Sequence, residues 1–449
     1  MPIFDLIVIG TGSAGATVAQ TARKAGKSVA IIDKLPFGGT CSQRGCDPKK
    51  VLVGAAEIVA RSEQMTGNGI ASAATINWPD LMAFKKTFTE PIPENTEAKF
   101  RDLGIQFYHG VATFLSPKTV RVGQDELTAD HIVVATGQRP KPLNIPGEEL
   151  LIDSTGFLEL SQLPEEIVMV GGGYIAFEFA HIAARAGAKV TILHQGKRPL
   201  EGFDADLVSL LVKAMEALGI RILLEANVTA VEGQKDRLTV RYEQAGESQS
   251  ILTNLVIHAA GRVADVAELA LEKAGVKVGP KGVAVNEFLQ SVSNPAIYAC
   301  GDVADKGLPL TPLASYEGKI AINNILTGNR QAYTDNPTPS AVYTIPTLAS
   351  VGLTEEQARK QGRKVKVTFQ ETNDWYTSRR INESFSAFKT LVDEETDEIV
   401  GAHLLGSGCD EVINLFTLAM KHHITAEDLR NTLLAYPTHG SDLSSMLPD

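Results

Sequence analysis

Near its N-terminus the chain reads Phe4-Asp5-Leu6-Ile7-Val8-Ile9-Gly10-Thr11-Gly12-Ser13-Ala14-Gly15. The apolar run before Gly10 is typical of an interior parallel strand, and the glycines turn it into a helix predicted over residues 16–25. In such a turn the first glycine allows a tight bend, the second lets the backbone approach a pyrophosphate, and the third lets the helix pack against the strand. The segment therefore predicts a dinucleotide-binding α/β fold.

A second strand, predicted over Val29 to Asp33, ends in a carboxylate at about the 20-residue spacing that suits a ribose-binding acid. A lone Gly-x-Gly-x-x-Gly would also fit an ordinary strand–helix turn, but here strand, turn, helix, strand and acid follow in order. We expect the first nucleotide to carry an unphosphorylated adenosine ribose. The predicted contact residues are Gly10, Gly12, Ser13, Gly15, Asp33 and Lys34.

A second turn of this kind reads Gly171-Gly172-Gly173-Tyr174-Ile175-Ala176. It follows a predicted strand at 167–170 and opens a helix to Ala186, and the next strand is predicted over Lys189 to Leu193. His194 stands where an acid would bind a plain ribose, whereas Lys197 and Arg198 suit a 2′-phosphate, which favours NADPH over NADH. The alternative is a solvated basic loop. The predicted contacts in the turn are Gly171, Gly173, Tyr174 and Ile175.

Two cysteines lie in the run Gly38-Gly39-Thr40-Cys41-Ser42-Gln43-Arg44-Gly45-Cys46-Asp47-Pro48-Lys49-Lys50. Pro48 suits the first position of a helix that continues over residues 49–60, so Cys46 should lie near a helix N-terminus, whose dipole favours a thiolate. The alternative is two small buried cysteines beside a turn. In a chain with two nucleotide folds, we favour a dithiol/disulfide pair at the end of an electron path.

The composition is that of a multidomain α/β enzyme. A length of 449 residues predicts about two to four domains, and 44% hydrophobic content with 39 glycines fits packed domains with tight turns. The net charge of -11 without long basic clusters argues against nucleic acid or a membrane as partner. We expect the protein in the cytoplasm, because four cysteines are too few for a secreted disulfide scaffold. No apolar run is long enough to span a membrane, and the first predicted strand leaves no room for a signal segment. No residue spacing predicts a metal site.

Together with the two turns and the cysteine run, three further motifs resemble the flavin-dependent pyridine nucleotide-disulfide oxidoreductases. These motifs are Ala135-Thr136-Gly137, Ala260-Gly261-Arg262 and Cys300-Gly301-Asp302. Glutathione reductase, dihydrolipoamide dehydrogenase and mercuric reductase belong to this family, and the resemblance covers essentially the whole chain. It implies FAD in the first site, NAD(P)H in the second, a disulfide on the far side of the flavin ring, and a homodimer.

The resemblance also implies roles for single residues. Cys46 matches the thiolate that contacts the flavin, and Cys41 matches the thiol that attacks substrate. Lys49 or Lys50 with Glu178 resembles the ion pair beside the reactive flavin nitrogen, and Tyr174 resembles the gate over the nicotinamide pocket. Further cofactor contacts are implied for Gly39, Thr40, Thr136, Gly137, Gly261, Arg262 and Asp302.

We expect an α/β protein with two Rossmann-like domains, for FAD and NAD(P), and a C-terminal α+β dimerisation domain. The FAD domain is predicted over 1–150 and 268–330, the NAD(P) domain over 151–267 and the dimerisation domain over 336–449. Further strands are predicted at 296–299, 341–343 and 389–392, and a helix at 411–422.

The C-terminal segment departs from the family. Glutathione reductase and dihydrolipoamide dehydrogenase carry His-Pro-Thr-x-x-Glu, whereas this chain reads Tyr436-Pro437-Thr438-His439-Gly440-Ser441-Asp442. A phenol loses its proton only near about pH 10 and is a poor proton shuttle at neutral pH, so ordinary disulfide reduction is in question. His439, oriented by Asp442, is the alternative shuttle. Mercuric reductase resembles the chain at Tyr436, but its C-terminal cysteine pair is missing here.

Glutathione is disfavoured for a second reason, since Gln20 and Asn324 stand where the glutathione-binding relative has arginines. We therefore expect NADPH to reduce the flavin, the flavin to reduce the Cys41–Cys46 disulfide, and the dithiol to serve a small-molecule or disulfide acceptor. The alternatives are a quinone, metal or oxidant reductase, or a redox-sensing flavoprotein with little turnover.

Overall fold

The computed structural model describes residues 2–448 and contains two compact units. The first unit holds the chain up to Lys49, Ala83–Lys141 and Gly261–Asp335. The second holds Lys50–Met82, Pro142–Ala260 and the chain from Asn336 onward.

The first unit is built on a seven-stranded mixed sheet. Its parallel strands, in spatial order, are β3 (Gln106–His109), β2 (Val29–Asp33), β1 (Ile3–Ile9) and β6 (Asp125–Val134), with β16 (Ile297–Ala299) also parallel to β6. The strands β5 (Thr119–Val122) and β4 (Ala112–Ser116) extend the sheet in antiparallel fashion beyond β6. The predicted strands β1, β2 and β16 are confirmed, β2 with the predicted bounds.

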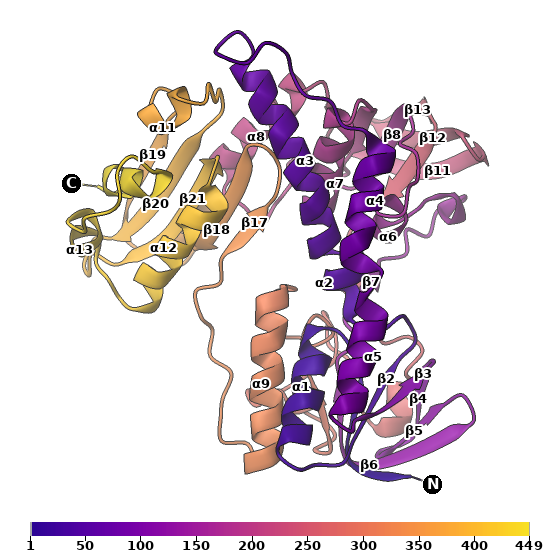
Figure 1. Cartoon of the computed structure of the whole chain (residues 1–449). Coiled ribbons are helices and arrows are strands. Elements are labelled where there is room, and N and C mark those ends of the chain that lie inside the picture. The colour runs from indigo at the N-terminus through magenta and orange to yellow at the C-terminus, as the bar shows by residue number, and fades with distance from the viewer. Residues whose placement is uncertain (1, 449) are drawn as a thin grey trace. The chain divides into compact units, whose positions relative to one another are not determined.

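Both faces of this sheet are covered, which explains why residues 6–9 of β1 are continuously apolar rather than alternating. Ile7 and Ile9 belong to one buried cluster, whereas Leu6 and Val8 belong to another on the opposite face. The helices on the second face are α1 (Ser13–Lys24), α5 (Ile92–Asp102) and α9 (Thr311–Thr327), of which α1 and α9 run side by side (Figure 1). A two-stranded ribbon joins β7 (Gln138–Pro140) to β15 (Arg262–Ala264).

The second unit contains the second nucleotide fold. Four parallel strands form its sheet in the order β10 (Arg221–Leu223), β9 (Lys189–Leu193), β8 (Glu166–Val170) and β14 (Leu255–His258). Its helices are α6 (Ser154–Phe157), α7 (Tyr174–Arg185) and α8 (Ala205–Ala217), and a three-stranded antiparallel sheet comprises β11 (Ala226–Gln234), β12 (Arg237–Gln244) and β13 (Glu247–Thr253). The predicted strand over 189–193 and the turn into α7 are confirmed.

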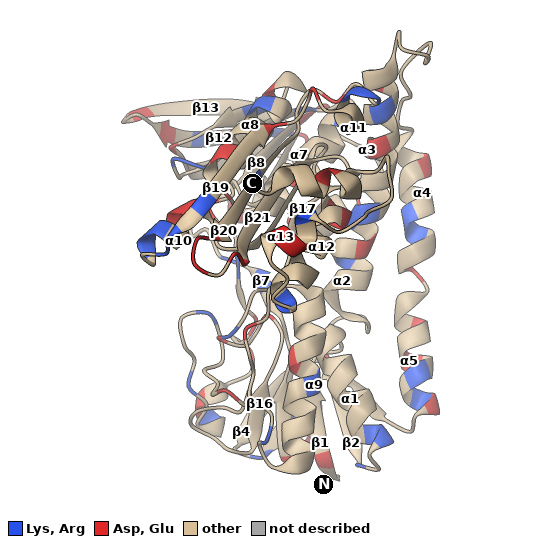
Figure 2. Ribbon diagram, turned by 90° about the vertical axis from the view of Figure 1, so that its left-hand side faces the viewer, with Lys and Arg blue, Asp and Glu red and all other residues tan. Residues whose placement is uncertain are grey.

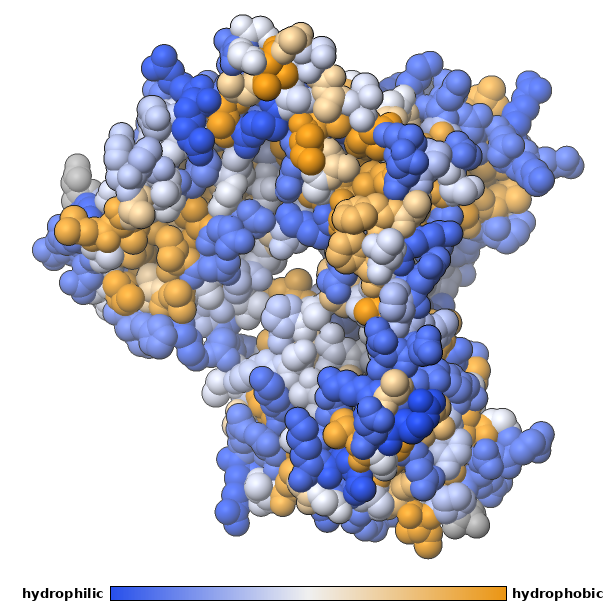
Figure 3. Space-filling view, viewed as in Figure 1, coloured by the Kyte–Doolittle hydropathy of each residue, from blue (hydrophilic) through white to orange (hydrophobic). Residues whose placement is uncertain are grey.

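The C-terminal part of this unit is the predicted α+β module. Its antiparallel sheet has the order β17 (Ser340–Val342), β18 (Thr347–Gly352), β21 (Ile399–Gly406), β20 (Ala387–Asp393) and β19 (Val365–Glu371). The helices are α10 (Glu355–Lys360), α11 (Tyr376–Arg379), α12 (Cys409–Lys421) and α13 (Ala426–Arg430). Figure 3 shows apolar side chains exposed in the region of α12 and α13, where Leu418 of α12 is 54% exposed.

The redox run forms two consecutive helices, α2 (Gly39–Arg44) and α3 (Cys46–Met65), and α4 (Trp78–Thr89) follows. The prediction that Pro48 opens the helix was wrong, because α3 begins at Cys46 and Pro48 is its third residue. A proline is tolerated there because the first four amides of a helix have no intrahelical acceptor. Acidic and basic residues are interspersed along α5, without a continuous basic stripe (Figure 2). Within residues 2–448, no helix has both the length and the apolar character that a membrane crossing requires.

Candidate redox and nucleotide sites

The two predicted redox cysteines lie on consecutive helices in the thiol form. Cys46 is exposed and is the first residue of α3, whereas Cys41 is half-buried in α2 and its thiol donates to Asp47 Oδ1 over 3.7 Å. The pKa of the Cys41 thiol is raised, chiefly by a hydrogen bond with Cys46 and next by burial, and a hydrogen bond with Thr311 opposes the shift. Cys41 therefore keeps its proton, while the dipole of α3 favours ionisation at Cys46.

The first glycine-rich turn lies directly against α2. A Cβ atom on Gly39, the first residue of α2, would lie 2.3 Å from Gly12 Cα, and one on Gly10 would lie 2.2 Å from the carbonyl oxygen of Ala135. Gly10 and Gly39 also have φ angles of +110° and +76°, which disfavour side chains. The structure thus brings the helix that carries Cys41 onto the predicted pyrophosphate-binding turn.

Asp33 lies at the end of β2, as predicted, and its carboxylate has partners within the protein. Its Oδ2 atom accepts hydrogen bonds from the amide of Thr11 at 2.8 Å and from the Thr11 hydroxyl at 2.7 Å. Its Oδ1 atom accepts from the Leu35 amide at 3.0 Å. A carboxylate has about four acceptor positions, so this geometry orients Asp33 and leaves capacity for a ribose hydroxyl. Thr11 was missed because the motif leaves the residue between its first two glycines unspecified.

Several predicted cofactor residues meet around Asp265. The Thr136 hydroxyl donates to the backbone carbonyl of Asp265 at 2.8 Å, and Lys34 Nζ lies 3.0 Å from the Asp265 carboxylate. Lys34 also pairs with Glu268. Although burial lowers the pKa of Lys34, its hydrogen bonds to Glu268 and Asp265 outweigh that effect and raise it. Lys34 is therefore held as a cation beside the end of β2.

Asp302 follows Gly301, whose left-handed φ of +74° turns the chain at the end of β16. Burial raises the pKa of the Asp302 carboxyl, and the nearby Arg262 opposes this shift. The Arg262 guanidinium donates to the Gln138 carbonyl at 2.5 Å. Asp302 and Arg262, predicted from separate motifs, are therefore electrostatic neighbours.

The second glycine-rich turn packs against β14 and β9. A Cβ atom on Gly171 would lie 2.2 Å from the carbonyl oxygen of Ala259, and one on Gly172 would lie 2.5 Å from Cγ of His194. The His194 ring therefore covers the turn. Its Nε2 atom lies 2.9 Å from the Arg198 carbonyl oxygen, which can only accept, so Nε2 carries the proton. Tyr174 begins α7 and is 46% exposed.

The loop after His194 contains both predicted cations, and its fold brings Glu201 back toward Gly196. Lys197 is exposed, and the Arg198 guanidinium donates to the Glu201 carbonyl at 3.2 Å. A Cβ atom on Gly196 would lie 2.7 Å from His194 Nε2 and 3.1 Å from Glu201 Oε1. The loop therefore folds back so that Arg198 and Glu201 both lie near His194.

Glu178 and Lys50 both contact the segment that opens the C-terminal sheet. Glu178 is 3% exposed, and its Oε1 atom accepts from the Tyr343 amide at 2.9 Å. Lys50 Nζ lies 4.3 Å from the centroid of the Tyr343 ring, 3.3 Å from Glu57 and 3.6 Å from Asp410. Lys49 is 7% exposed. Lys50 is thus already engaged by two carboxylates and an aromatic face.

The two candidate shuttles of the C-terminal segment differ in environment. Tyr436 is 79% exposed. His439 packs against Gly408, where a Cβ atom would lie 3.0 Å from its ring, and burial followed by the charge of Arg380 lowers its pKa. The predicted orienting partner, Asp442, accepts a hydrogen bond from the Thr377 hydroxyl at 2.5 Å.

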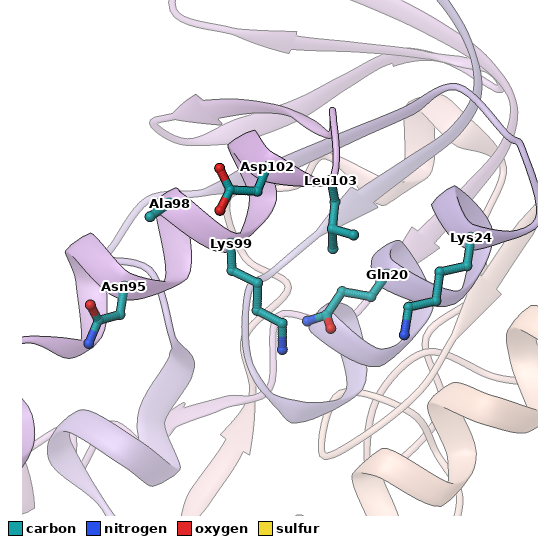
Figure 4. Close-up of a pocket in the computed structure, with 7 residues that line it drawn as sticks. All are labelled: Gln20, Lys24, Asn95, Ala98, Lys99, Asp102 and Leu103. Carbon is teal, nitrogen blue, oxygen red and sulfur yellow. The ribbon is translucent and has the colours of Figure 1, made fainter.

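Gln20, one of the two predicted glutathione positions, lines a pocket of about 450 Å³ between α1 and α5, together with Lys24 and Lys99 (Figure 4). The other predicted glutathione position, Asn324, is completely buried, and its side chain bonds to Phe288 and to Gln331. Asn324 is therefore a structural residue. Within residues 2–448, no cluster of three or more His, Cys, Asp or Glu residues suits a metal ion.

Comparison with known families agrees with this geometry. Residues 4–318 match the family described as pyridine nucleotide-disulphide oxidoreductase, and residues 338–446 match the dimerisation domain of the same family. The chain belongs to the pyridine nucleotide-disulphide oxidoreductases and is an enzyme of the FAD- and pyridine nucleotide-dependent kind. The predicted fold class, with Rossmann-like domains and a dimerisation domain, is confirmed.

The relatives include enzymes with different acceptors. A glutathione reductase of Nostoc sp. is 34% identical over 99% of both chains, and a mercuric reductase of Staphylococcus aureus is 31% identical over 98% of this chain and 81% of its own. A solved structure, the Cu(II) complex of the HOCl-induced flavoprotein disulfide reductase RclA from Escherichia coli, superimposes with a TM-score of 0.89 at 28% identity, over 99% of both chains.

Proposed function

We propose that the chain transfers electrons from NADPH through FAD to the Cys41–Cys46 pair, and from there to an acceptor other than oxidised glutathione. The observation that carries the proposal is the contact between Gly39 and Gly12, because it places the thiol-bearing α2 against the first glycine-rich turn. A solely structural cysteine pair would not need this arrangement, in which two backbones meet without side chains.

The residues present fit FAD in the first unit. Gly10 and Gly39 form a turn that a Cβ atom would obstruct, Asp33 is oriented by Thr11, and the buried Asp302 carboxyl suits the hydroxyls of a ribityl chain. When bound, FAD accepts a hydride equivalent from the nicotinamide and passes two electrons to a disulfide. The remaining predicted contacts, Ser13, Gly15, Lys34, Thr40, Thr136, Gly137, Gly261 and Arg262, belong to the same unit.

The two thiols have distinct roles in this proposal. Cys46 supplies the thiolate that faces the flavin, because it is the first residue of α3 and the helix dipole favours its charge. Cys41 supplies the sulfur that meets the acceptor, and because its pKa is raised, its proton must pass to a base or to the solvent before it attacks. Either Lys49 or Lys50 is proposed to pair with Glu178 beside the flavin. Lys49 is 7% exposed, and Lys50 also contacts Glu57 and Asp410.

For the second site we propose Gly171, Gly173, Tyr174 and Ile175 as nucleotide contacts, with His194, Lys197 and Arg198 selecting NADPH. The position of His194 on the turn supports this assignment, since no carboxylate occupies that place. Glu201 lies close enough to Gly196 to weaken the preference. Charge-assisted hydrogen bonds to the phosphate contribute roughly 1.5 to 3 kcal/mol each, so the cations should still dominate.

The acceptor proposal rests on the C-terminal segment and on the glutathione positions. A phenol at position 436 does not relay protons as an imidazole does, and His439 is packed against Gly408 rather than exposed. The side-chain amide of Asn324 donates to the backbone carbonyls of Phe288 and Gln331. The dimerisation domain supports a homodimer. Tyr436, which is more exposed than His439, is the group proposed to approach the acceptor.

A second candidate is reduction of a metal ion. The observation that favours it is the exposed Tyr436 where a histidine would serve disulfide exchange, together with the Cu(II) complex of the structural relative RclA. In this version the metal ion is the substrate, and the reduced Cys41–Cys46 pair or the flavin supplies single electrons to it.

Anaerobic titration with NADPH, followed by turnover with disulfides, quinones and Cu(II), tests the function. We expect bleaching of the flavin and turnover that a Cys41→Ser variant loses if the dithiol is the donor. Cys409→Ser, which changes a thiol outside the redox pair, is the matched control. Full turnover by Cys41→Ser would instead place the acceptor at the flavin, and no turnover with any acceptor would favour a redox sensor. Rapid reduction of oxidised glutathione would overturn the acceptor proposal, and His439→Ala would then show whether the shuttle had moved.

A further inference from the structure

A buried acid lies beneath the Gly301–Asp302 turn and has no part in the roles assigned above. Glu317, in the second turn of α9, is 1% exposed, and its Oε2 atom accepts the Gly301 amide hydrogen at 2.7 Å. Its other oxygen is also enclosed, because a Cβ atom on Gly307 would lie 2.6 Å from Oε1. Glu317 therefore fixes the backbone that presents Asp302.

The same place is packed tightly against the first glycine-rich turn. A Cβ atom on Gly318, the residue after Glu317, would lie 2.8 Å from the carbonyl oxygen of Ala14, and one on Gly301 would lie 3.2 Å from the Cβ of Ala14. Ala14 is in the first turn of α1, two residues after Gly12. A shift of the Glu317 side chain would therefore move Asp302 relative to the pyrophosphate-binding turn.

We propose that Glu317 is a positioning residue for FAD, which holds the Gly301–Asp302 turn in its cofactor-binding form, and that a negative charge on its buried carboxyl weakens FAD binding. This inference rests on the proposed FAD site. Glu317 itself touches the Gly301 amide, not the cofactor, and acts through Asp302.

The electrostatic surroundings explain why the proton matters. Burial raises the pKa of Glu317 to about 8, and Asp302 adds to the shift, whereas the Gly301 hydrogen bond and Lys306 oppose it. Ionised Glu317 places a second buried negative charge beside Asp302, close to a site that must also accept the phosphates of FAD. Since binding and proton release are linked, FAD should bind less tightly as pH rises through this value. The other titratable groups near this cluster are Cys300, Tyr316, Tyr333, Asp335 and Arg262.

The test is the rate at which FAD leaves the whole protein after dilution, followed by flavin fluorescence at about pH 7 and about pH 9. Wild-type protein should release FAD several-fold faster at the higher pH. Glu317→Gln should release it slowly at both values, because an amide oxygen accepts the Gly301 amide and cannot ionise. Glu317→Ala should release it rapidly at both, and Glu272→Gln, which changes an exposed carboxyl of the same unit, should follow the wild type.

The same pH dependence in Glu317→Gln and wild type would overturn the inference, and so would FAD retention by Glu317→Ala. Should Glu317→Ala fail to fold, the pH profile of Glu317→Gln decides alone. A wild-type protein that binds no FAD at either pH would overturn the proposed function as well, so the two failures are distinguishable.

Discussion

Replacing Lys389 by methionine should destabilise the second unit far more than loss of an ordinary ion pair. Lys389, on β20, is 3% exposed and meets three carboxylates from two elements. Its Nζ atom lies 3.1 Å from Asp204 at the start of α8 and 3.0 Å from Glu355 in α10, and it also contacts Asp206. One cation thus joins the nucleotide fold to the C-terminal sheet.

The size of the effect follows from the exposure of these partners. Asp204 is 4% exposed and would keep a buried, uncompensated charge, whereas Glu355 and Asp206 are 23% and 56% exposed and can be hydrated. Removing one partner of a buried pair costs about 3 to 5 kcal/mol, and with only one fully buried carboxylate we expect the lower end of that range. The Arg241–Glu232 pair is exposed, so water and salt screen it and its loss should have a much smaller effect.

Urea unfolding, followed by tryptophan fluorescence, provides the assay. One of the two tryptophans, Trp375, has its ring centroid 5.7 Å from that of Phe388, the neighbour of Lys389. The Lys389→Met midpoint should fall well below those of the wild type and of the control Arg241→Met. The hydrogen bond with Lys389 is the main cause of the lowered pKa of Glu355. The Lys389–Glu355 pair therefore stabilises the fold fully above pH 4.5, the ordinary pKa of this carboxyl, and this stabilisation is lost as the pH falls through the lowered pKa. The difference in urea midpoint between the wild type and Lys389→Met should therefore become smaller at acidic pH. Equal midpoints for the two variants at neutral pH would refute the reasoning.

Four further predictions concern the proposed chemistry. Two-electron reduction should produce a broad long-wavelength absorption band that Cys46→Ala abolishes, and the same band in that variant would contradict the role of Cys46. Changing both Lys197 and Arg198 to alanine should lower kcat/KM for NADPH at least about tenfold, since about 1.4 kcal/mol corresponds to tenfold. The same change should leave kcat/KM for NADH nearly unchanged. Equal kcat/KM values for NADPH and NADH in the wild type would exclude the proposed preference for NADPH. Tyr436→Phe should scarcely alter flavin reduction by NADPH in stopped-flow measurements. Wild-type kcat for oxidised glutathione should stay below ~10 s⁻¹, and a higher value would remove the argument from Tyr436.

The features that the sequence predicts well are those set by local backbone requirements. The glycines at 10 and 171 adopt φ values of +110° and +121° that few other residues tolerate. The strand–turn–helix units around them can therefore be predicted from the sequence alone. The strands β2 and β9 have the predicted bounds because both are short apolar runs with clear flanking residues. The start of α3 was misplaced because proline, although commonest at the first helical position, is also tolerated at the third.

Residues whose roles depend on distant partners carry no such local signal. Glu317 is a single acid within a helix, and nothing nearby indicates that it receives the Gly301 amide. Thr11 occupies an unspecified motif position, yet it orients Asp33 across 22 residues of sequence. Glu201 reaches Gly196 only through the fold of its loop. Predicting these contacts requires the tertiary arrangement that the motifs themselves do not encode.

The contact between Gly12 and Gly39 has a consequence for how such an enzyme diversifies. Because a single carbon at position 39 would approach Gly12 Cα to 2.3 Å, the spacing between the nucleotide turn and the helix of Cys41 admits neither a side chain nor gradual adjustment. Substitution of Gly12 or Gly39 should therefore disturb the packing of the Cys41 helix on the nucleotide turn. New acceptors must arise through substitutions at tolerant, exposed positions such as 436, which makes the C-terminal segment the natural target for redirecting this scaffold to another oxidant.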